Sequence, residues 1–269
     1  MYNRDMIFKQ LQDMNAPRNS VVHMHISLKS VGEIEGRGEG LLDILIDYFT
    51  GEGGLLFVPA HTWKNLADIS KPTLDFNISE TSIGKFPQLA IEDKRGVRTM
   101  HPTHSIVVFG NEKRVEEFVK HDDNTNTSTS PDGCYGQIYK DGGKILLIGI
   151  GHEKNTFIHC VEEMLDVPDR LEKTSVQVQI KKEDGEIISR ELYSHIRGLG
   201  ISDYYPKYEK AFRMHNCITD GFIGDAKVQL CDAEGIKNVV EMIYKNSGGI
   251  EVLKNDKEID ESFYMEKRK

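Results

Sequence analysis

The sequence predicts one α/β domain with a mixed central sheet, helices on its flanks and a β-rich C-terminal part. Three observations support this fold class. Helical and strand patterns alternate over the first two thirds of the chain, as they do in α/β proteins. An apolar run at 145–148 is typical of a strand buried on both faces. In the last third, short strands with alternating apolar and polar residues predominate.

The domain organisation follows from the length and the absence of a clear boundary. A chain of 269 residues is long enough to bury one large core. We find no internal repeat and no clean linker, so residues 1–254 are assigned to a single domain. The segment 255–269 is rich in charged residues, and we expect this tail to fray.

The elements of the first two thirds are predicted from the spacing of apolar residues and from the glycine-rich and polar breaks between them. Met6, Ile7, Leu11 and Met14 have helical spacing, and the glycine-rich stretch 36–40 opens the second helix. The predicted order is helix 4–14, strand 20–27, helix 41–49, strand 55–59, helix 81–92, strand 105–109, helix 112–121, strand 144–150 and helix 155–165.

The last third begins with a predicted hairpin. Val176, Val178 and Ile180 alternate with polar residues, and Asp184-Gly185 forms a turn signal before the next apolar pair. A helix at 203–215, a strand at 221–230 and a helix at 233–244 complete the predicted domain.

The charge balance excludes one class of partner. Lys and Arg number 34 and Asp and Glu number 43, giving a net charge of −9. A nucleic-acid binder needs a basic surface, and an anionic membrane surface is disfavoured for the same reason. The charge suits a cationic small molecule, and it equally suits plain solubility.

The cysteines and the hydropathy pattern indicate where in the cell the protein is located. The four cysteines are widely scattered without CxxC spacing, so we expect reduced thiols in a cytoplasmic protein. No stretch approaches the ~20 apolar residues of a membrane span, and no apolar signal core follows the N-terminus. A homodimer is the expectation from the frequency of such assemblies.

The first candidate site is the stretch His25–Gly32, which follows the predicted strand 20–27. Ligands of open α/β sheets sit beyond the carboxyl ends of strands, where loop N–H groups can face an anion. Ser27, Ser30 and Gly32 suit a tight turn with free donors, and Lys29 adds a positive charge. An ordinary strand-to-helix turn is the alternative.

Four histidines suggest a second possibility. His23 and His25 alternate in the strand and therefore project to one face, and His101 and His104 form another pair. Such pairs can ligate a metal ion. We find no acidic residue at a matching strand end, and buried structural histidines with satisfied hydrogen bonds are the alternative.

The third candidate is the block from Arg98 to Ser105. Pro102 forces an extended conformation on His101, directly before the strand 105–109. Arg98 and His101 are donors of the kind that hold phosphates. Taken alone, the block is also compatible with a rigid loop.

The strongest local pattern lies where the strand 144–150 gives way to a helix. His159 falls in the first turns of that helix, and Glu162 lies three residues later on the same face. A carboxylate beside an imidazole raises its basicity and orients the ring, which would make His159 a general base. A surface pair is the alternative. The phosphate motifs GxxxxGK[ST] and GxGxxG and the hydrolase motif GxSxG are absent.

In this order, the motifs resemble the aminoglycoside 3-N-acetyltransferase family of coenzyme A-dependent enzymes. The ordered set covers roughly residues 4–245 and is more specific than any one block. The family has its own α/β fold, distinct from the common N-acetyltransferase fold. The blocks are His25-x-Ser27-Leu28-Lys29-Ser30-Val31-Gly32, Glu35-Gly36, Gly53–Pro59, Arg98-Thr-x-His101-Pro102-x-x-Ser105 with Gly110, Ser130-Pro131, Leu147–Gly149, Thr156-x-x-His159-x-x-Glu162 and Gly221–Asp232.

The resemblance implies direct transfer of acetyl from acetyl-coenzyme A to an amine of an aminoglycoside or a related amino compound, without a metal. It makes His159 the base, with Asp203 or Glu162 as its carboxylate partner. The implied coenzyme residues are His25, Ser27, Leu28, Lys29, Ser30, Val31, Gly32, Arg98, His101, Pro102 and Ser105.

The acceptor site is implied at Trp63, Lys64 and Glu163. Lys64 departs from the family, because an acid at this place would hold a polycationic drug whereas a lysine repels it. Two alternatives remain. One is a metal-dependent hydrolase that uses His23, His25, His101 and His104, and the other is a catalytically idle homologue that binds coenzyme A.

Overall fold

A seven-stranded mixed sheet forms the centre of the molecule in the computed structural model, which describes residues 1–63, 73–76, 80–196, 198–255 and 257–265. The strand order is β4-β5-β2-β1-β6-β10-β9. β1 runs parallel to β2 and β6, and the other neighbours are antiparallel. The strands are β1 (Val21–Ile26), β2 (Leu55–Pro59), β4 (Val97–Arg98), β5 (Ile106–Phe109), β6 (Lys144–Ile148), β9 (Ile218–Ile223) and β10 (Ala226–Asp232). The predicted mixed sheet is confirmed.

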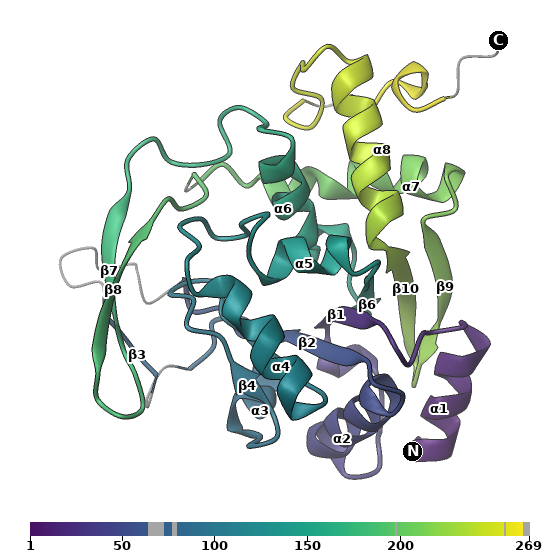
Figure 1. Cartoon of the computed structure of the whole chain (residues 1–269). Coiled ribbons are helices and arrows are strands. Elements are labelled where there is room, and N and C mark those ends of the chain that lie inside the picture. Colours follow the sequence, from purple (N-terminus) through teal and green to yellow (C-terminus); the bar gives the residue numbers. More distant parts are fainter. Residues whose placement is uncertain (64–72, 77–79, 197, 256, 266–269) are drawn as a thin grey trace.

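Helices cover both faces of this sheet (Figure 1). Apolar side chains of α1, α2 and α3 pack on one face, and those of α4, α5, α6, α7 and α8 pack on the other. β2 is buried along its whole length, and so is most of β1 and β6, as expected of strands covered on two sides. The helices are α1 (Arg4–Asp13), α2 (Arg37–Thr50), α3 (Lys85–Glu92), α4 (Glu112–Val119), α5 (Cys134–Lys140), α6 (Phe157–Met164), α7 (Glu209–Met214) and α8 (Ala233–Asn246).

A second, three-stranded sheet lies to one side of the main sheet (Figure 1). It consists of β3 (Thr73–Asp75), β7 (Val176–Lys181) and β8 (Ile187–Leu192). β7 and β8 form the predicted hairpin, so this prediction is confirmed. Their alternating residues bury only two small apolar clusters.

Two predictions for the last third need correction. The single strand expected at 221–230 is wrong, because β9 and β10 form a hairpin that turns at Gly224. Gly224 has a φ of +58°, and a Cβ there would meet the carbonyl oxygen of Val31. The helix expected at 203–215 begins as a 3-10 helix, Ile201–Tyr208, and continues as α7. Helix α5 was not predicted, because it has only seven residues.

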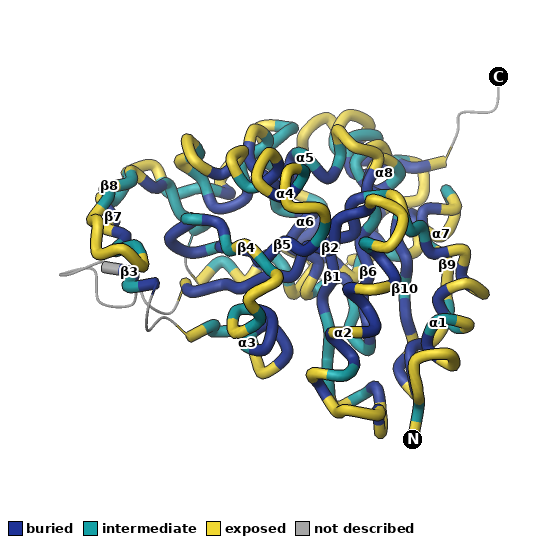
Figure 2. Tube along the Cα trace, turned by 60° about the horizontal axis from the view of Figure 1, so that its bottom comes forward, coloured by how far each residue is buried: buried dark blue, intermediate teal, exposed yellow. Residues whose placement is uncertain are grey.

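Part of the C-terminal segment that is expected to fray packs against the core. Ile259 and Tyr264 are buried in the core beside α8, and Figure 2 shows this buried stretch close to the terminus. The four cysteines are all buried and free. Within the described ranges, the structure contains no helix that is long and apolar enough to cross a membrane.

Candidate active site

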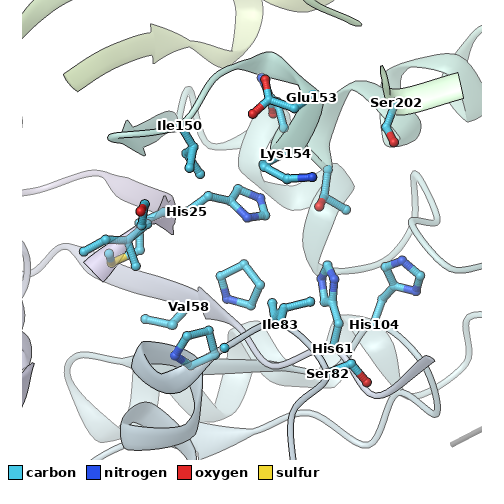
Figure 3. A pocket seen from close by; sticks show the side chains of 18 of the residues that line it. His25, Val58, His61, Ser82, Ile83, His104, Ile150, Glu153, Lys154 and Ser202 are labelled. Atoms are coloured by element: carbon cyan, nitrogen blue, oxygen red, sulfur yellow. The ribbon is translucent and has the colours of Figure 1, made fainter. Parts of the chain in front are cut away.

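A pocket of about 710 Å³ opens at the carboxyl ends of the three parallel strands (Figure 3). This is where ligands bind in open α/β sheets, because the connecting loops diverge there. Residues at the ends of β1 and β2, the loop that follows β6 and the start of α6 all contribute. The lining consists of Met24, His25, Ile26, Ser27, Val58, Pro59, His61, Trp63, Ser82, Ile83, Gly84, Pro87, His104, Ile150, Glu153, Lys154, Asn155, Thr156, His159 and Ser202.

Imidazole rings form a continuous row along this pocket. His25, His61, His104 and His159 line it. Ring centroids are 6.5 Å apart for His25 and His61 and 4.5 Å for His61 and His104. His195, which lies outside the lining, connects the row, at 5.5 Å from His104 and 4.3 Å from His159. Burial lowers the pKa of all four lining histidines, that of His25 to about 3. These side chains are therefore neutral at pH 7.

His159 is oriented by a tyrosine and a glutamate. The Tyr205 hydroxyl donates to Glu162 Oε2 at 2.5 Å and lies 2.7 Å from His159 Nδ1. Because its only proton goes to the carboxylate, the hydroxyl oxygen must accept the proton that His159 carries on Nδ1. That tautomer leaves Nε2 with a free electron pair, so the arrangement equips His159 to accept a proton.

Glu162 is anchored on its other side by an arginine. Arg170 Nε donates to Glu162 Oε1 at 2.7 Å, and the Arg170 guanidinium also pairs with Glu251 at 2.9 Å. Burial raises the pKa of Glu162, and the charge of Arg170 and the Tyr205 hydrogen bond oppose that effect. Burial likewise raises the pKa of Tyr205, which keeps its hydroxyl protonated.

Glu163 belongs to a different set of contacts. Its oxygens accept hydrogen bonds from the hydroxyls of Thr127 and Thr129, and one lies 3.2 Å from His195 Nε2. The His195 ring stacks on His159 with an angle of 22° between the planes. Burial alone would raise the pKa of Glu163, but the hydrogen bonds with His195 and the two threonines lower it overall. Glu163 is thus a buried anchor, and it does not line the pocket.

Of the predicted coenzyme turn His25–Gly32, the first part lines the pocket, with His25 and Ser27. The backbone N–H groups of Ser27, Ser30 and Val31 already donate to protein carbonyls. Val31 is buried, and a Cβ on Gly32 would meet the Asp225 carboxylate.

Among the residues that the structure describes, the lysine that lines the pocket follows β6. It is Lys154, at the end of the 3-10 helix His152–Lys154, whereas Lys29 lies outside the lining.

The predicted coenzyme residues of the Arg98–Ser105 block lie outside the lining of the pocket. Arg98 Nε lies 3.2 Å from Ser105 Oγ, and Ser105 donates to the carbonyl of Ala60 at 2.8 Å. The carbonyl of Pro102 accepts from Thr62 at 3.0 Å. Arg98, His101, Pro102 and Ser105 do not appear in the lining. Arg98, Pro102 and Ser105 hold the loop that follows β2, which carries His61 and Trp63.

The four histidines of the metal hypothesis do not converge on one point. His101 Nε2 lies 2.9 Å from the carbonyl of Thr127, and its Nδ1 accepts backbone N–H bonds from Thr103 and His104. Both of its ring nitrogens are therefore engaged. His23 is fully buried beneath Phe57 and Tyr135. Within the described residues, no three His, Cys, Asp or Glu side chains are placed to hold a metal ion.

The remaining predicted residues are scattered. Asp203 is exposed in the first turn of Ile201–Tyr208. The His159 ring contacts Tyr205 and His195 and lies 3.8 Å from the Glu162 carboxylate. Trp63 lines the pocket and is 45% exposed. Lys64 lies outside the described residues.

Sequence reasoning missed Tyr205, Arg170 and His195. Tyr205 and His195 are remote in the chain from α6, whereas Arg170 lies only eight residues after Glu162. No local motif marks any of them.

Comparisons with known proteins agree on one family. The sequence model described as aminoglycoside 3-N-acetyltransferase matches residues 24–245. Aminoglycoside N(3)-acetyltransferase IV from Salmonella sp. is 27% identical over 165 residues, which is 59% of this chain and only 58% of that relative. The chain thus matches less than two thirds of this curated relative.

Solved structures agree on the fold. The AAC-IIIb binary complex with CoASH superposes with a TM-score of 0.74 at 20% identity, covering 88% of this chain and 94% of that one. Sisomicin-bound AAC-VIa gives 0.69 at 20% identity, covering 88% and 95%. These structures therefore share the fold of this chain.

Proposed function

The chain belongs to the aminoglycoside 3-N-acetyltransferase family, and on that premise we propose that it is an acetyl-coenzyme A-dependent N-acetyltransferase with His159 as its general base. The observation that carries this proposal is the Arg170–Glu162–Tyr205–His159 chain of contacts, which ends at the wall of the pocket. We also propose a cytoplasmic location, which the four free, buried cysteines support.

The proposed reaction uses the free electron pair of His159 Nε2. As the acceptor amine attacks the thioester carbonyl, its nitrogen forms a bond to the acetyl carbon and gives a proton to Nε2. The carbon–sulfur bond then breaks, the thiolate leaves, and the imidazolium returns that proton to the sulfur. Burial lowers the pKa of His159, so the ring is neutral and ready to accept at pH 7.

Tyr205 and Glu162 act in this proposal through His159. While the ring carries two protons, its Nδ1–H donates to the Tyr205 oxygen, and the hydroxyl donates to Glu162. Glu162 places negative charge 3.8 Å from Nδ1, which stabilises the imidazolium. Arg170 keeps that carboxylate in place. This assigns the role of carboxylate partner to Glu162 in preference to the exposed Asp203.

The pocket offers suitable groups for the coenzyme as co-substrate. Asn155 Oδ1 and His25 Nε2 are buried and have no hydrogen-bond partner among the described residues, and both residues line the pocket. Such atoms need partners, and the amide groups of a pantetheine arm supply them. Lys154 offers a positive charge at the same edge.

For the oxyanion we propose donors at the turn that follows Ser27. The N–H groups of Leu28 and Lys29 open the 3-10 helix Leu28–Ser30, so they have no intrahelical acceptor.

The test is acetyl transfer measured by thiol release, together with thermal unfolding. Coenzyme A is expected to raise the Tm of the wild type and of His159→Ala alike. Only the wild type is expected to release thiol in the presence of an amine. Full activity of His159→Ala would remove this residue from the mechanism. A Tm that coenzyme A leaves unchanged would remove the coenzyme from the proposal, and a Tm rise without transfer to any amine would indicate the idle homologue.

A further inference from the structure

The pocket contains very few fixed charges for a protein with a net charge of −9. Among the lining residues that the structure describes, Glu153 and Lys154 are the charged ones, and they carry opposite signs. They are adjacent in the chain, and Figure 3 shows both in the upper part of the pocket. The described lining therefore has no net negative charge at pH 7.

The nearby carboxylates are already used. Glu162 accepts from Arg170 with one oxygen and from Tyr205 with the other. Glu163 accepts from Thr127 and from Thr129. Both glutamates are nearly completely buried and lie outside the lining. A cationic ligand would have to break these contacts to reach either of them.

The histidines do not replace the missing acids. Burial keeps His25, His61, His104 and His159 neutral, and any protonation at lower pH would make the pocket positive. A neutral ring nitrogen can accept one hydrogen bond from an ammonium group, but it offers no countercharge. An ammonium group that leaves water without a countercharge binds weakly.

Much of the rest of the wall is apolar, and its polar side chains are uncharged, namely Ser27, Ser82, Asn155, Thr156 and Ser202. Val58, Pro59, Ile83, Pro87 and Ile150 line the pocket together with the ring of Trp63. Such a wall suits an aromatic ring or the apolar face of a sugar.

We propose that the acceptor carries one amine on an uncharged or acidic body, and that polycations are poor substrates. This inference rests on the proposed function, because it describes the acceptor of the same site. A single amine that loses its proton during the reaction leaves no unpaired cation in the pocket. Glu153 is the single carboxylate among the described lining residues, so a polycation with two or more further ammonium groups would leave at least one of them there without a carboxylate.

The experiment compares glucosamine and tyramine, which carry one amine each, with spermidine and kanamycin, which carry several. The expected kcat/KM is at least about tenfold higher for the better monoamine than for either polycation. A polycation that is acetylated as well as the monoamines, or better, overturns the inference while leaving the proposed function intact.

A matched pair of variants tests the physical reason. Ser202 lines the pocket and is half-buried. Ser202→Asp adds the missing negative charge, and Ser202→Asn adds the same volume without it. Ser202→Asp is expected to raise kcat/KM for kanamycin relative to glucosamine about three- to tenfold at low salt, with less effect at high salt. An equal ratio in the two variants contradicts the electrostatic argument.

If no amine is acetylated, the binding of each amine still tests the inference that the pocket prefers a single amine. In that case the proposed function fails, and the Tm of the protein with each amine is the readout. Stabilisation by tyramine or glucosamine and not by the polycations supports a single-amine pocket. Stronger stabilisation by kanamycin or spermidine in the wild type overturns it.

Discussion

Two adjacent glutamates of α6 serve His159 in different ways. Glu162 reaches the imidazole through the Tyr205 hydroxyl and is held by Arg170. Glu163 holds His195, whose ring stacks on that of His159. Consecutive residues on a helix point about 100° apart, so the two carboxylates enter separate surroundings.

The difference shows how one helix can both orient the His159 imidazole, through Glu162, and support it, through Glu163 and His195. The contacts of Glu162 determine which ring nitrogen carries the proton, and those of Glu163 determine where the ring lies. Burial raises the pKa of Glu162, whereas hydrogen bonds lower that of Glu163. We therefore expect changes on the first side to affect catalysis and changes on the second side to affect acid stability and the pH profile.

The largest effect is expected for Glu162→Ala. Removing this carboxylate leaves the buried Arg170 with Glu251 alone, and breaking a buried pair in this way costs about 3–5 kcal/mol of unfolding free energy. Urea unfolding at pH 7 measures the loss. The control is Glu251→Ala, whose carboxylate is 36% exposed and whose loss is expected to be smaller. Equal losses would mean that Glu162 has no special part in the core.

Tyr205→Phe separates orientation from stability. The ring stays, but His159 Nδ1 loses its acceptor, and kcat is expected to fall about 10- to 100-fold with little change in the KM for acetyl-coenzyme A. Tyr208→Phe is the matched control, because it changes another buried tyrosine of the same 3-10 helix. Wild-type kcat in Tyr205→Phe would show that the hydroxyl does not orient the base.

Glu163→Gln tests the second side of α6. The folded protein lowers the pKa of Glu163 below its ordinary value of 4.5. Its stabilisation is therefore fully present above that value and is lost as the pH falls through the lower, folded-state pKa. We expect the variant to be about 1–2 kcal/mol less stable at pH 7 and the difference to shrink in acid. Unfolding curves at several pH values measure this, and a constant difference would contradict it.

The smallest effect is expected for His195→Phe. The stacked ring is kept, but the positive charge that His195 can carry is lost, and this charge contributes to lowering the pKa of His159. The pKa of His159 should therefore rise, which moves the acid limb of the kcat/KM profile to higher pH. A shift of less than about one unit is expected. A shift to lower pH would exclude an electrostatic influence of His195.

The sequence predicted much of the frame of the site. The strands that became β1, β2, β5 and β6 were found from their apolar runs, and their ends form the pocket. His25, Ser27 and His159 were selected from these ends and from the residues that follow them, Trp63 was implied by the family resemblance, and all four line the pocket. The Arg98–Ser105 block was also recognised, but its position behind the pocket depends on hydrogen bonds to Ala60 and Thr62.

The sequence by itself determined that His159 and Glu162 share one face of a helix, because a spacing of three residues fixes this wherever a helix forms. Only the tertiary structure decided how the Glu162 carboxylate is linked to the His159 imidazole. Tyr205 lies 43 residues after Glu162, and it reaches both side chains because the 3-10 helix Ile201–Tyr208 packs against the 3-10 helix His152–Lys154, which precedes α6. Helical periodicity is local and can be read from a chain. A hydroxyl group from a distant segment is positioned by packing, for which the sequence contains no short-range signal.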